Sequence, residues 1–474
     1  MSLFSGIETA YSAMSAQQLF LETSAHNIAN ASTPGYHRQD VSTVASTPLQ
    51  EGSGIWVGTG VQVLSVGRPV DSFVETSLYQ QLGQQGSLDI QQQTTSQIGS
   101  IFNDLGTNST GSLLDQFWSS WSDVANAPTD MGARQSLIGS AQNLASSIQS
   151  NYQQLQSMQQ NLDTQVSQSV SPLNGLTSQI ASLNQQITQA QADGGSANDL
   201  LDQRANALTQ LSTLAGVTSF NKPNGTVQVV LGSTLLVDGN TSTTLSTQEN
   251  ASGMQDLVAP DGTVIKPTSG TIGGLESLRD GEIPTRMTAL NDFAQRLITA
   301  VNGVQTGVDP TTGAVTNVYN LVTPGTPAQQ NFFAGTGAAD IAVDPSIVSD
   351  PRLIAASQTA NGSGDGSNAQ AMAALKTDTS AGGVANGLTL DGQYQALATA
   401  IGMSASNAQA ADTNQQSVVA SLQQQRDQLS GVSLDQEAAN TVLYQQAYNA
   451  AARVLATFDQ VLDQLINHTG LPGG

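Results

Sequence analysis

Apolar residues recur at alternating intervals of three and four at both ends of the chain. Near the start this row comprises Leu3, Ile7, Ala10, Met14, Gln17, Leu21, Ser24 and Ile28. Near the end it comprises Tyr444, Tyr448, Ala451, Leu455, Phe458, Leu462 and Leu465. This spacing predicts two helices that pack at a shallow angle on other helices. Because the first row holds two polar residues and several small ones, we expect both helices to be marginal alone and to become ordered against each other and against neighbouring molecules.

The first helix is predicted to end at Asn30. Pro34 disfavours helical geometry at Thr33, and Gly35 permits a sharp reversal of the chain. Beyond this break, residues 36–44 and 54–68 alternate apolar with polar positions between glycines. That alternation predicts a β-hairpin.

A long helical region is predicted from about residue 71 to residue 214, and its apolar spacing is most regular over residues 137–187. It would form a rod about 80 Å long if Pro172 only kinks it. Two consecutive glycines end this rod, and Asp199 is predicted to cap the helix that follows.

The second half of the chain changes character several times. Residues 216–274 contain short alternating runs between glycines, which predict strands, and residues 287–304 return to helical spacing. Residues 306–340 are rich in turn-forming residues, and residues 352–432 predict helix rich in Ala and Gln. The predicted fold class is α+β and mainly α, with coiled-coil helices at the ends, an elongated helical bundle and a small inserted β-rich domain.

The predicted domains are nested, because the helical bundle is assembled from discontinuous segments. The terminal helices occupy residues 1–35 and 433–474, and we expect them to be disordered in a single molecule. The helical body takes residues 36–215, 275–305 and 341–432, including the N-terminal hairpin. Residues 216–274 and 306–340 are assigned to the β-rich outer domain.

Composition and charge narrow the possible partners. Charged residues make up only 10% of the chain and aromatic residues 4%, and the net charge is −23 with 13 Lys and Arg. Nucleic acids and anionic membrane surfaces are disfavoured, since both bind clustered cations. There is no cysteine, no apolar run long enough to span a membrane, and no Lys or Arg before Arg38. We therefore expect a cytosolic protein, or one exported without a cleaved signal peptide.

The histidines and glycine clusters give weak evidence for chemistry. His26, His37 and His468 lack the spacing of a metal site, so we assign them surface or interface positions. The glycine clusters at 58–60 and 362–366 lack the strand and helix context of phosphate-binding loops. The second cluster contains an aspartate but not the calcium loop with its terminal glutamate. We expect no metal and no cofactor.

Carboxylate pairs leave one enzymatic alternative open. Asp199 with Asp202, and Asp459 with Asp463, lie at helix-surface spacing, and a glycosidase needs two carboxylates that converge only in the fold. The shortage of aromatic residues argues against a carbohydrate site, and Trp56, Trp118 and Trp121 are interpreted as packing residues. We expect the protein not to be an enzyme.

Residues 25–41, AHNIANASTPGYHRQDV, resemble the N-terminal signature of bacterial flagellar rod, hook and hook-associated proteins. The positions that match are Asn27, Ile28, Ala29, Asn30, Thr33, Pro34, Gly35 and Tyr36. Residues 57–74 resemble the segment that follows in the same group. Further stretches are similar to the hook-associated protein 1 family in particular: residues 126–144, 197–217, 273–302, 364–375 and 430–467.

The resemblance implies a structural, non-enzymatic subunit in a short ring between hook and filament. Its terminal helices would line the inner tube, and its β domain would face outward. The implied partners are the hook protein, the second junction protein (hook-associated protein 3) and copies of the chain itself. The chain would leave the cell unfolded through type III export, after a chaperone has held its C-terminal helix.

Within that implied ring, residues of the two terminal rows would pack together in the inner tube, and Pro34 and Tyr36 would set the angle between terminal helix and body. Three alternatives stay open: the hook protein itself, a secreted carbohydrate-active enzyme, and a generic cytosolic coiled-coil scaffold.

Overall fold

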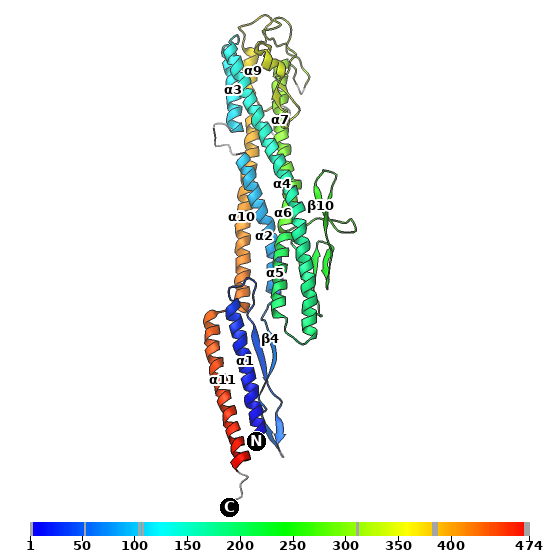
Figure 1. Cartoon of the computed structure of the whole chain (residues 1–474). Helices are drawn as coiled ribbons and strands as arrows, with labels where there is room; N and C mark the ends of the chain where they lie inside the picture. The colour runs from blue at the N-terminus through cyan, green and yellow to red at the C-terminus, as the bar shows by residue number, and fades with distance from the viewer. Residues whose placement is uncertain are drawn as a thin grey trace, which may run out of the picture.

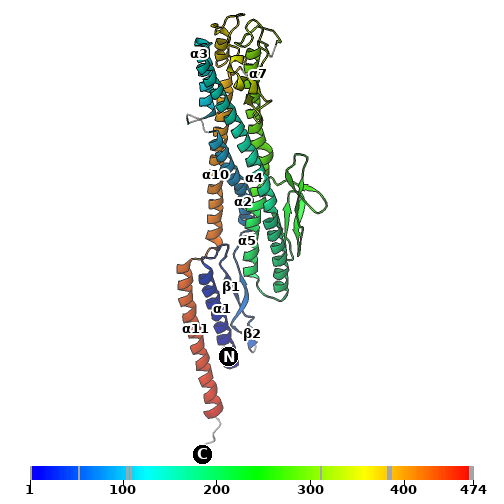
Figure 2. The same ribbon diagram turned by 45° about the horizontal axis from the view of Figure 1, so that its top comes forward.

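The computed structural model describes residues 3–51, 54–102, 106, 109–309, 312–381 and 387–468. Figure 1 shows an elongated molecule in which a long helical body continues into a separate pair of helices that carries both chain termini. A small group of strands projects from the side of the body. The terminal pair lies at one end of the long axis in both Figure 1 and Figure 2.

The terminal pair consists of α1 and α11, which run side by side in opposite directions. A long β-ribbon lies along α1 and connects it to the body. The ribbon is antiparallel, with a register shift between Ser42 and Thr43, and a second strand pair continues it. The bounds are α1 Leu3–Asn30, β1 Asp40–Ala45, β2 Leu49–Glu51, β3 Ile55–Val57, β4 Val61–Gly67 and α11 Leu434–Asp463, the last followed by a π turn at Gln464–His468.

The body is built from helices that are far apart in sequence. Four come from the first half of the chain: α2 Ser72–Ile101, α3 Thr110–Asn126, α4 Met131–Ala192 and α5 Asn198–Ala215. The later ones are α6 Gly270–Ser277, α7 Ile283–Thr306, α8 Pro345–Ser349, α9 Ser367–Ala374 and α10 Leu390–Ser430. A π turn at Leu278–Glu282 joins α6 to α7, and a 3₁₀ turn follows α8 at Pro351–Leu353. The helical body thus combines segments from both halves of the chain.

The longest helix, α4, has local signals at its start and end. The Asp130 side chain caps it by accepting a hydrogen bond from the backbone N–H of Gly132. It runs for 62 residues, about 93 Å, and continues through Pro172. The cap predicted for the next helix is wrong, because α5 begins at Asn198 after Ala197, without a side-chain cap. Asp199 lies in its first turn instead.

The core follows the apolar row of α4. Leu137, Ala141, Leu144 and Ile148 are fully buried there. At the end of the body distant from the termini, five aromatic side chains pack together: Phe117, Trp118, Trp121, Phe332 and Phe333. The prediction that all three tryptophans are packing residues is wrong for Trp56, which is 65% exposed near the tip of the β-ribbon.

The β insertion contains two antiparallel sheets that pack against α4. Alternate residues of β6 are buried, as the period-two pattern requires. The four-stranded sheet consists of β5 Thr218–Asn221, β6 Val227–Leu231, β7 Thr234–Asp238 and β8 Thr241–Ser242. The three-stranded sheet consists of β9 Ser246–Glu249, β10 Gln255–Val258 and β11 Val264–Ile265.

Residues 306–340 do not join this insertion, contrary to the predicted grouping. Within their described part, Phe332 and Phe333 pack on Phe117 in the aromatic cluster, at the opposite end of the body from the termini. The only named strand there is β12, Phe333–Ala334, which pairs with β13, Ala342–Val343. The two segments share a turn-rich composition but bury their apolar residues in different places.

The buried Arg279 fastens the β insertion to the body. Its guanidinium is fully buried and donates to Asp163 Oδ1 on α4 at 2.8 Å, to Asp280 Oδ1 at 2.7 Å and to Asp256 Oδ1 on β10 at 3.2 Å. Gln159 Nε2 donates to the backbone carbonyl of Arg279 at 2.9 Å. One cation therefore neutralises carboxylates from three separate elements.

We expect R279A to destabilise the fold by about 3–5 kcal/mol, because it leaves the partly buried Asp163 and Asp256 carboxylates without their countercharge. Chemical denaturation measures the loss, and limited proteolysis should show faster cleavage within residues 218–265. The matched control is R352A, since Arg352 pairs with Asp350 on the surface, where an ion pair contributes little to stability. Equal stability of the two variants would contradict this role of Arg279.

Candidate functional site

The sequence motif at residues 25–41 spans the end of α1 and lies where the terminal pair meets the body. We call this region the joint and define it by two clusters of polar side chains. The Asn27 cluster contains Ser24, Asn27, Tyr36, Gln39 and Glu437. The His37 cluster contains His37, Arg68, Glu75 and Asp202.

The turn after α1 brings these residues together. The backbone N–H of Thr33 donates to Asn30 O at 2.9 Å, and that of Tyr36 donates to Thr33 O at 3.2 Å. Gly35 has φ of +78°, a conformation that a side chain would strain. The chain therefore reverses within five residues, and Tyr36 returns to the last turns of α1.

Asn27 uses its whole amide group in the joint. Its Oδ1 accepts from Tyr36 Oη at 2.7 Å and from the backbone N–H of Gln39 at 2.9 Å. Its Nδ2 donates to Gln39 O at 2.9 Å and to Glu437 Oε1 at 3.2 Å. Asn27 is buried, so each bond is made away from competing water. One side chain thus holds together α1, the start of the β-ribbon and α11.

Glu437 is a buried carboxylate in the first turn of α11. Ser24 Oγ donates to its Oε2 at 2.7 Å, and Asn27 donates to its other oxygen. Its position near the helix N-terminus adds a favourable interaction with the helix dipole. Burial, together with the nearby charges of Asp199, Asp202 and Glu437, raises the pKa of Tyr36, so that phenol stays protonated and able to donate.

The His37 cluster connects the β-ribbon to α2 and α5. His37 is 3% exposed, and its Nδ1 lies 2.7 Å from Asp202 Oδ1 while its Nε2 lies 3.3 Å from Glu75 Oε1. Arg68, at the end of the ribbon, also pairs with Asp202. The predicted surface or interface position is therefore wrong for His37, which is buried within the chain.

The protonation of His37 is set by these neighbours. Burial lowers the pKa of His37, but hydrogen bonds to Asp202 and Glu75 outweigh it and raise the pKa to about 9. For Glu75, burial acts upward, while hydrogen bonds from His37 and Tyr79 lower the pKa below its usual value. A positive imidazolium between carboxylates therefore links the ribbon to the body at neutral pH.

Backbone and amide contacts complete the joint. The N–H of Arg38 donates to Ser430 O, at the end of α10, at 2.8 Å. Asn198 Nδ2 donates to Val66 O at 2.9 Å, and Gln39 Nε2 donates to Asp199 Oδ1 at 2.8 Å. The base of the ribbon is thus fixed to the C-terminal end of α10 and to the N-terminal end of α5.

The α1–α11 pair uses side chains of different sizes along its length. Phe20 stacks on Tyr444 with ring centroids 4.8 Å apart. Gly6 lies directly against the ring of Phe458, where a Cβ would come within 2.4 Å of a ring carbon. Glycine is therefore needed at position 6 for the helices to approach this closely.

The residues of the two predicted rows differ in burial and in their contacts within the chain. Tyr444 and Phe458 face α1, and Tyr448, Ala451, Leu455 and Leu462 are half-buried like them. On α1, Gly6, Phe20 and Asn27 contact α11. Each of them comes one position before a residue of the predicted row, namely residues 7, 21 and 28. Ala10 is buried, Ile7, Met14 and Leu21 are half-buried, and the side chain of Leu3 lies outside the described residues. Ile28 and Leu465 are exposed, by 38% and 52%.

The rest of the motif has less burial than Asn27. Ala29, Thr33 and Pro34 are exposed, and Asn30 donates to His26 O at 3.1 Å. The polar Ser24, which weakened the predicted row, instead supplies a buried hydrogen bond. Glu437 and Asp202 were missed as joint residues, because nothing in their local spacing signals a partner hundreds of residues away.

Large apolar side chains remain exposed on the terminal pair and the ribbon. We call this set the terminal apolar surface: Phe4 and Tyr11 on α1, Leu49, Ile55, Trp56 and Leu64 on the ribbon, Leu434, Val442, Leu443, Val454 and Val461 on α11, and Leu465 on the π turn that follows it. Exposed apolar patches, where they are contiguous, are typical of interaction sites.

The other candidate groups are already occupied by protein contacts. Asp202 pairs with His37 and Arg68, and Asp199 accepts from Gln39. Asp365, in the second glycine cluster, accepts from Ser357, Ser367 and nearby backbone N–H groups. No group of three metal-binding side chains occurs among the described residues. In the same part of the chain, no helix has the length and apolar character to span a bilayer. The side chain of His468 lies outside the described residues.

Comparison with known proteins finds similarity to flagellar proteins along most of the chain. Residues 95–316 match the flagellar hook-associated protein FlgK helical domain, residues 7–37 the flagella basal body rod protein family, and residues 423–468 the C-terminal family of flagellar basal body rod FlgEFG proteins. Flagellar hook-associated protein 1 of Bacillus subtilis is 29% identical over 100% of this chain and 99% of its own length. The chain is thus similar to flagellar hook-associated protein 1 over its whole length.

Two further hook-associated protein 1 sequences and one solved structure are also similar to this chain. The proteins of Salmonella typhimurium and Escherichia coli are 27% and 26% identical, each over 97% of this chain and 99% of the relative. The solved flagellar hook junction protein FlgK of Burkholderia pseudomallei superposes with a TM-score of 0.62 at 19% identity, covering 76% of this chain and all of that one. That likeness confirms a mainly α fold with small sheets.

We expect N27A to loosen the terminal pair, because it removes the donor to Glu437 Oε1 and both side-chain partners of the Gln39 backbone, at a cost of about 1–3 kcal/mol for each group left unsatisfied. Hydrogen exchange should accelerate in α1 and in the first turns of α11. N30A is the control, since Asn30 bonds only within its own turn. If both variants exchange alike, the amide of Asn27 is not what holds the pair.

The raised pKa of His37 predicts a pH dependence. Its ordinary value is 6.5 and its folded value about 9, so its contribution to stability is complete below about pH 6.5 and is lost as the pH rises through 9. The thermal midpoint should therefore fall between these values, and H37Q should flatten that fall. H26Q, which changes an exposed histidine, should keep the wild-type profile. A wild-type slope in H37Q would contradict the assignment.

Proposed function

We propose that this chain is a structural subunit of the bacterial flagellum, placed at the junction between hook and filament. The observation that carries this function is the terminal pair, which extends beyond the body and exposes apolar side chains along its length. The relatives named flagellar hook-associated protein 1 match it from end to end. The protein has a mechanical role and is not an enzyme.

Assembly uses the terminal apolar surface. Each large apolar side chain that becomes buried contributes about 1.5–3 kcal/mol, so a few of them are enough to hold neighbouring subunits. The outer side of α11 presents Leu443, Val454 and Val461, which do not face α1. These residues, with Ile28 and Leu465 from the predicted rows, contact adjacent copies, the hook protein and hook-associated protein 3.

The same exposed surface fits the proposed route of export. The chain leaves the cell unfolded by type III export, and it has no cysteine that would form disulfides on the way. Its terminal helices are held to the body mainly through the joint, so they separate before the body unfolds. A chaperone covers the apolar side of the C-terminal helix until export and prevents aggregation.

The joint gives the subunit a defined shape once assembled. The Asn27 cluster holds the two terminal helices together, and the His37 cluster fixes the ribbon on α2 and α5. Tyr36 contributes through its bond to Asn27. Force applied to the terminal pair is therefore transmitted to the body through buried hydrogen bonds and ion pairs.

We expect L443D to prevent attachment of filaments, because it places a charge within an apolar contact between subunits. The isolated variant should keep the wild-type circular dichroism and thermal midpoint, since Leu443 is 60% exposed. V264D is the matched control, because Val264 is similarly exposed on the β insertion. Motility and electron microscopy of complemented cells measure the outcome. Normal filaments with L443D would refute the proposed use of this surface.

A further inference from the structure

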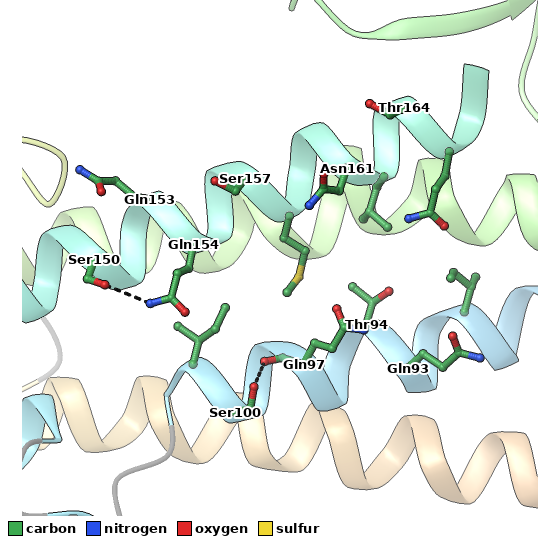
Figure 3. Close-up of a pocket in the computed structure, with 15 residues that line it drawn as sticks. Gln93, Thr94, Gln97, Ser100, Ser150, Gln153, Gln154, Ser157, Asn161 and Thr164 are labelled. Carbon is green, nitrogen blue, oxygen red and sulfur yellow. Dashed lines mark hydrogen bonds between the residues drawn. The ribbon is translucent and has the colours of Figure 1, made fainter. Parts of the chain in front are cut away.

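A groove of about 860 Å³ runs between α2 and α4 (Figure 3). Its walls come from the second half of α2 and from residues 150–165 of α4. Figure 3 shows Gln93 and Gln97 on one wall, and Gln154, Ser157 and Asn161 on the other. The floor between them is apolar and includes Ile90, Met158 and Leu162.

None of the fifteen residues that line the groove is charged. The two nearest acidic residues of these helices face elsewhere, because Asp163 pairs with Arg279 and Asp89 interacts with Asp412 of α10. Among the described residues, the side-chain amides of Gln93, Gln97 and Asn161 make no hydrogen bond within the protein, although Gln154 bonds to Ser150. The groove therefore offers amide donors and acceptors above an apolar floor.

The outer face of α10 has matching chemistry. Asp412 is the only charged residue between positions 392 and 425, and it is buried against α2. The exposed face of this helix is broad and uncharged from Gly402 to Gln425, and it carries amides such as Gln409 and Gln416 beside smaller side chains. We call one line of exposed residues along this face the outer row: Met403, Ser406, Ala410, Thr413, Ser417, Ala420 and Gln424. α10 lies on the side of α2 away from α4, so its outer row and the groove are on different sides of the body.

We propose that the groove between α2 and α4 receives the outer row of α10 from a second copy of this chain. The proposal rests on the proposed function, since it names the contact by which neighbouring bodies pack side by side.

The dimensions of the groove fit one helix. Residues 150–165 span about 22 Å, and a helix is about 10 Å across with its side chains. The groove is therefore long enough for about four turns of a helix.

Charge explains why these two faces would meet. Two copies of a chain with net charge −23 repel each other wherever carboxylates come together, and such juxtaposition at an interface costs several kcal/mol. Contact between two uncharged faces avoids this cost. Gln, Asn, Ser and Thr also supply both donors and acceptors, so the two faces can satisfy each other.

The arrangement of the two faces determines the kind of assembly. The groove and the outer row are different surfaces, so each copy can use one with each neighbour. A contact of this kind repeats head to tail and gives a closed ring or a helical array. It does not stop at a dimer, and it leaves the terminal apolar surface free for contacts in the inner tube.

Cysteine cross-linking tests the contact directly, because the natural chain has no cysteine. Cells would express S157C, in the groove, together with S417C, on α10, and assembled flagella would be oxidised. We expect disulfide-linked dimers of the two variants, since a disulfide requires Cα atoms within about 7 Å. The control pair is S182C with S417C, because Ser182 is exposed on α4 outside the groove. It should give only background.

The outcomes separate this proposal from the proposed function. The cysteine variants could be absent from flagella while the wild-type chain is present in the flagella of a parallel strain. In that case the charge substitutions described below decide whether the contact exists. If no form of the chain is found in flagella, the proposed function fails, and this proposal with it. Incorporated variants that cross-link no better than the control, or an S157C thiol linked to a different protein, would overturn the contact while leaving the function standing.

A pair of charge substitutions gives a second measurement that needs no disulfide. S157D should reduce incorporation, because it places a carboxylate in the groove against an uncharged neighbour. Adding S417K to the same chain should restore incorporation, because each copy then meets the opposite charge on the next. Failure of S417K to restore incorporation would overturn the proposal.

Discussion

The buried carboxylate of Glu437 is the interaction on which the shape of the molecule depends. It accepts hydrogen bonds from Ser24 and Asn27, residues more than 400 positions earlier in the chain. A buried charge is tolerated only when it is bonded, so this carboxylate requires both ends of the chain to be present and paired. Everything between the two ends must therefore fold so that they return to one place.

The polar joint and the apolar terminal pair have complementary roles. Directional bonds at Asn27 and His37 define where the pair begins relative to the body. The pair itself buries only one side of each helix, because Gly6 and Phe20 face α11 while Phe4 and Tyr11 remain exposed. The position of the terminal pair is consequently well defined at the joint, while one side of each terminal helix remains exposed. This arrangement suits the proposed subunit, whose ends are buried by its neighbours.

The long helices of the body are poor in charge. The long helices α2, α4 and α10 carry few charged residues, and several of these are used inside the chain, as in the Asp163–Arg279 pair. Solvent-exposed helices normally carry charges that keep proteins apart. Helices rich in Gln, Ser and Ala instead remain soluble while still allowing a second uncharged surface to approach. The low charge of these helices therefore fits the proposed lateral packing of neighbouring bodies.

The sequence by itself determined the elements whose cause is local. Spacing of three and four gave the long helices, alternation gave the ribbon and the β insertion, and Pro34 with Gly35 ended the first helix, because these effects act within a few residues. Only the tertiary structure decided which side of α1 faces α11, since a rotation by one residue changes the contacts but hardly changes the pattern. It also decided that His37 is buried, that Trp56 is exposed and that Phe332 and Phe333 join the aromatic cluster. Those outcomes depend on partners distant in sequence, and no local pattern carries that information.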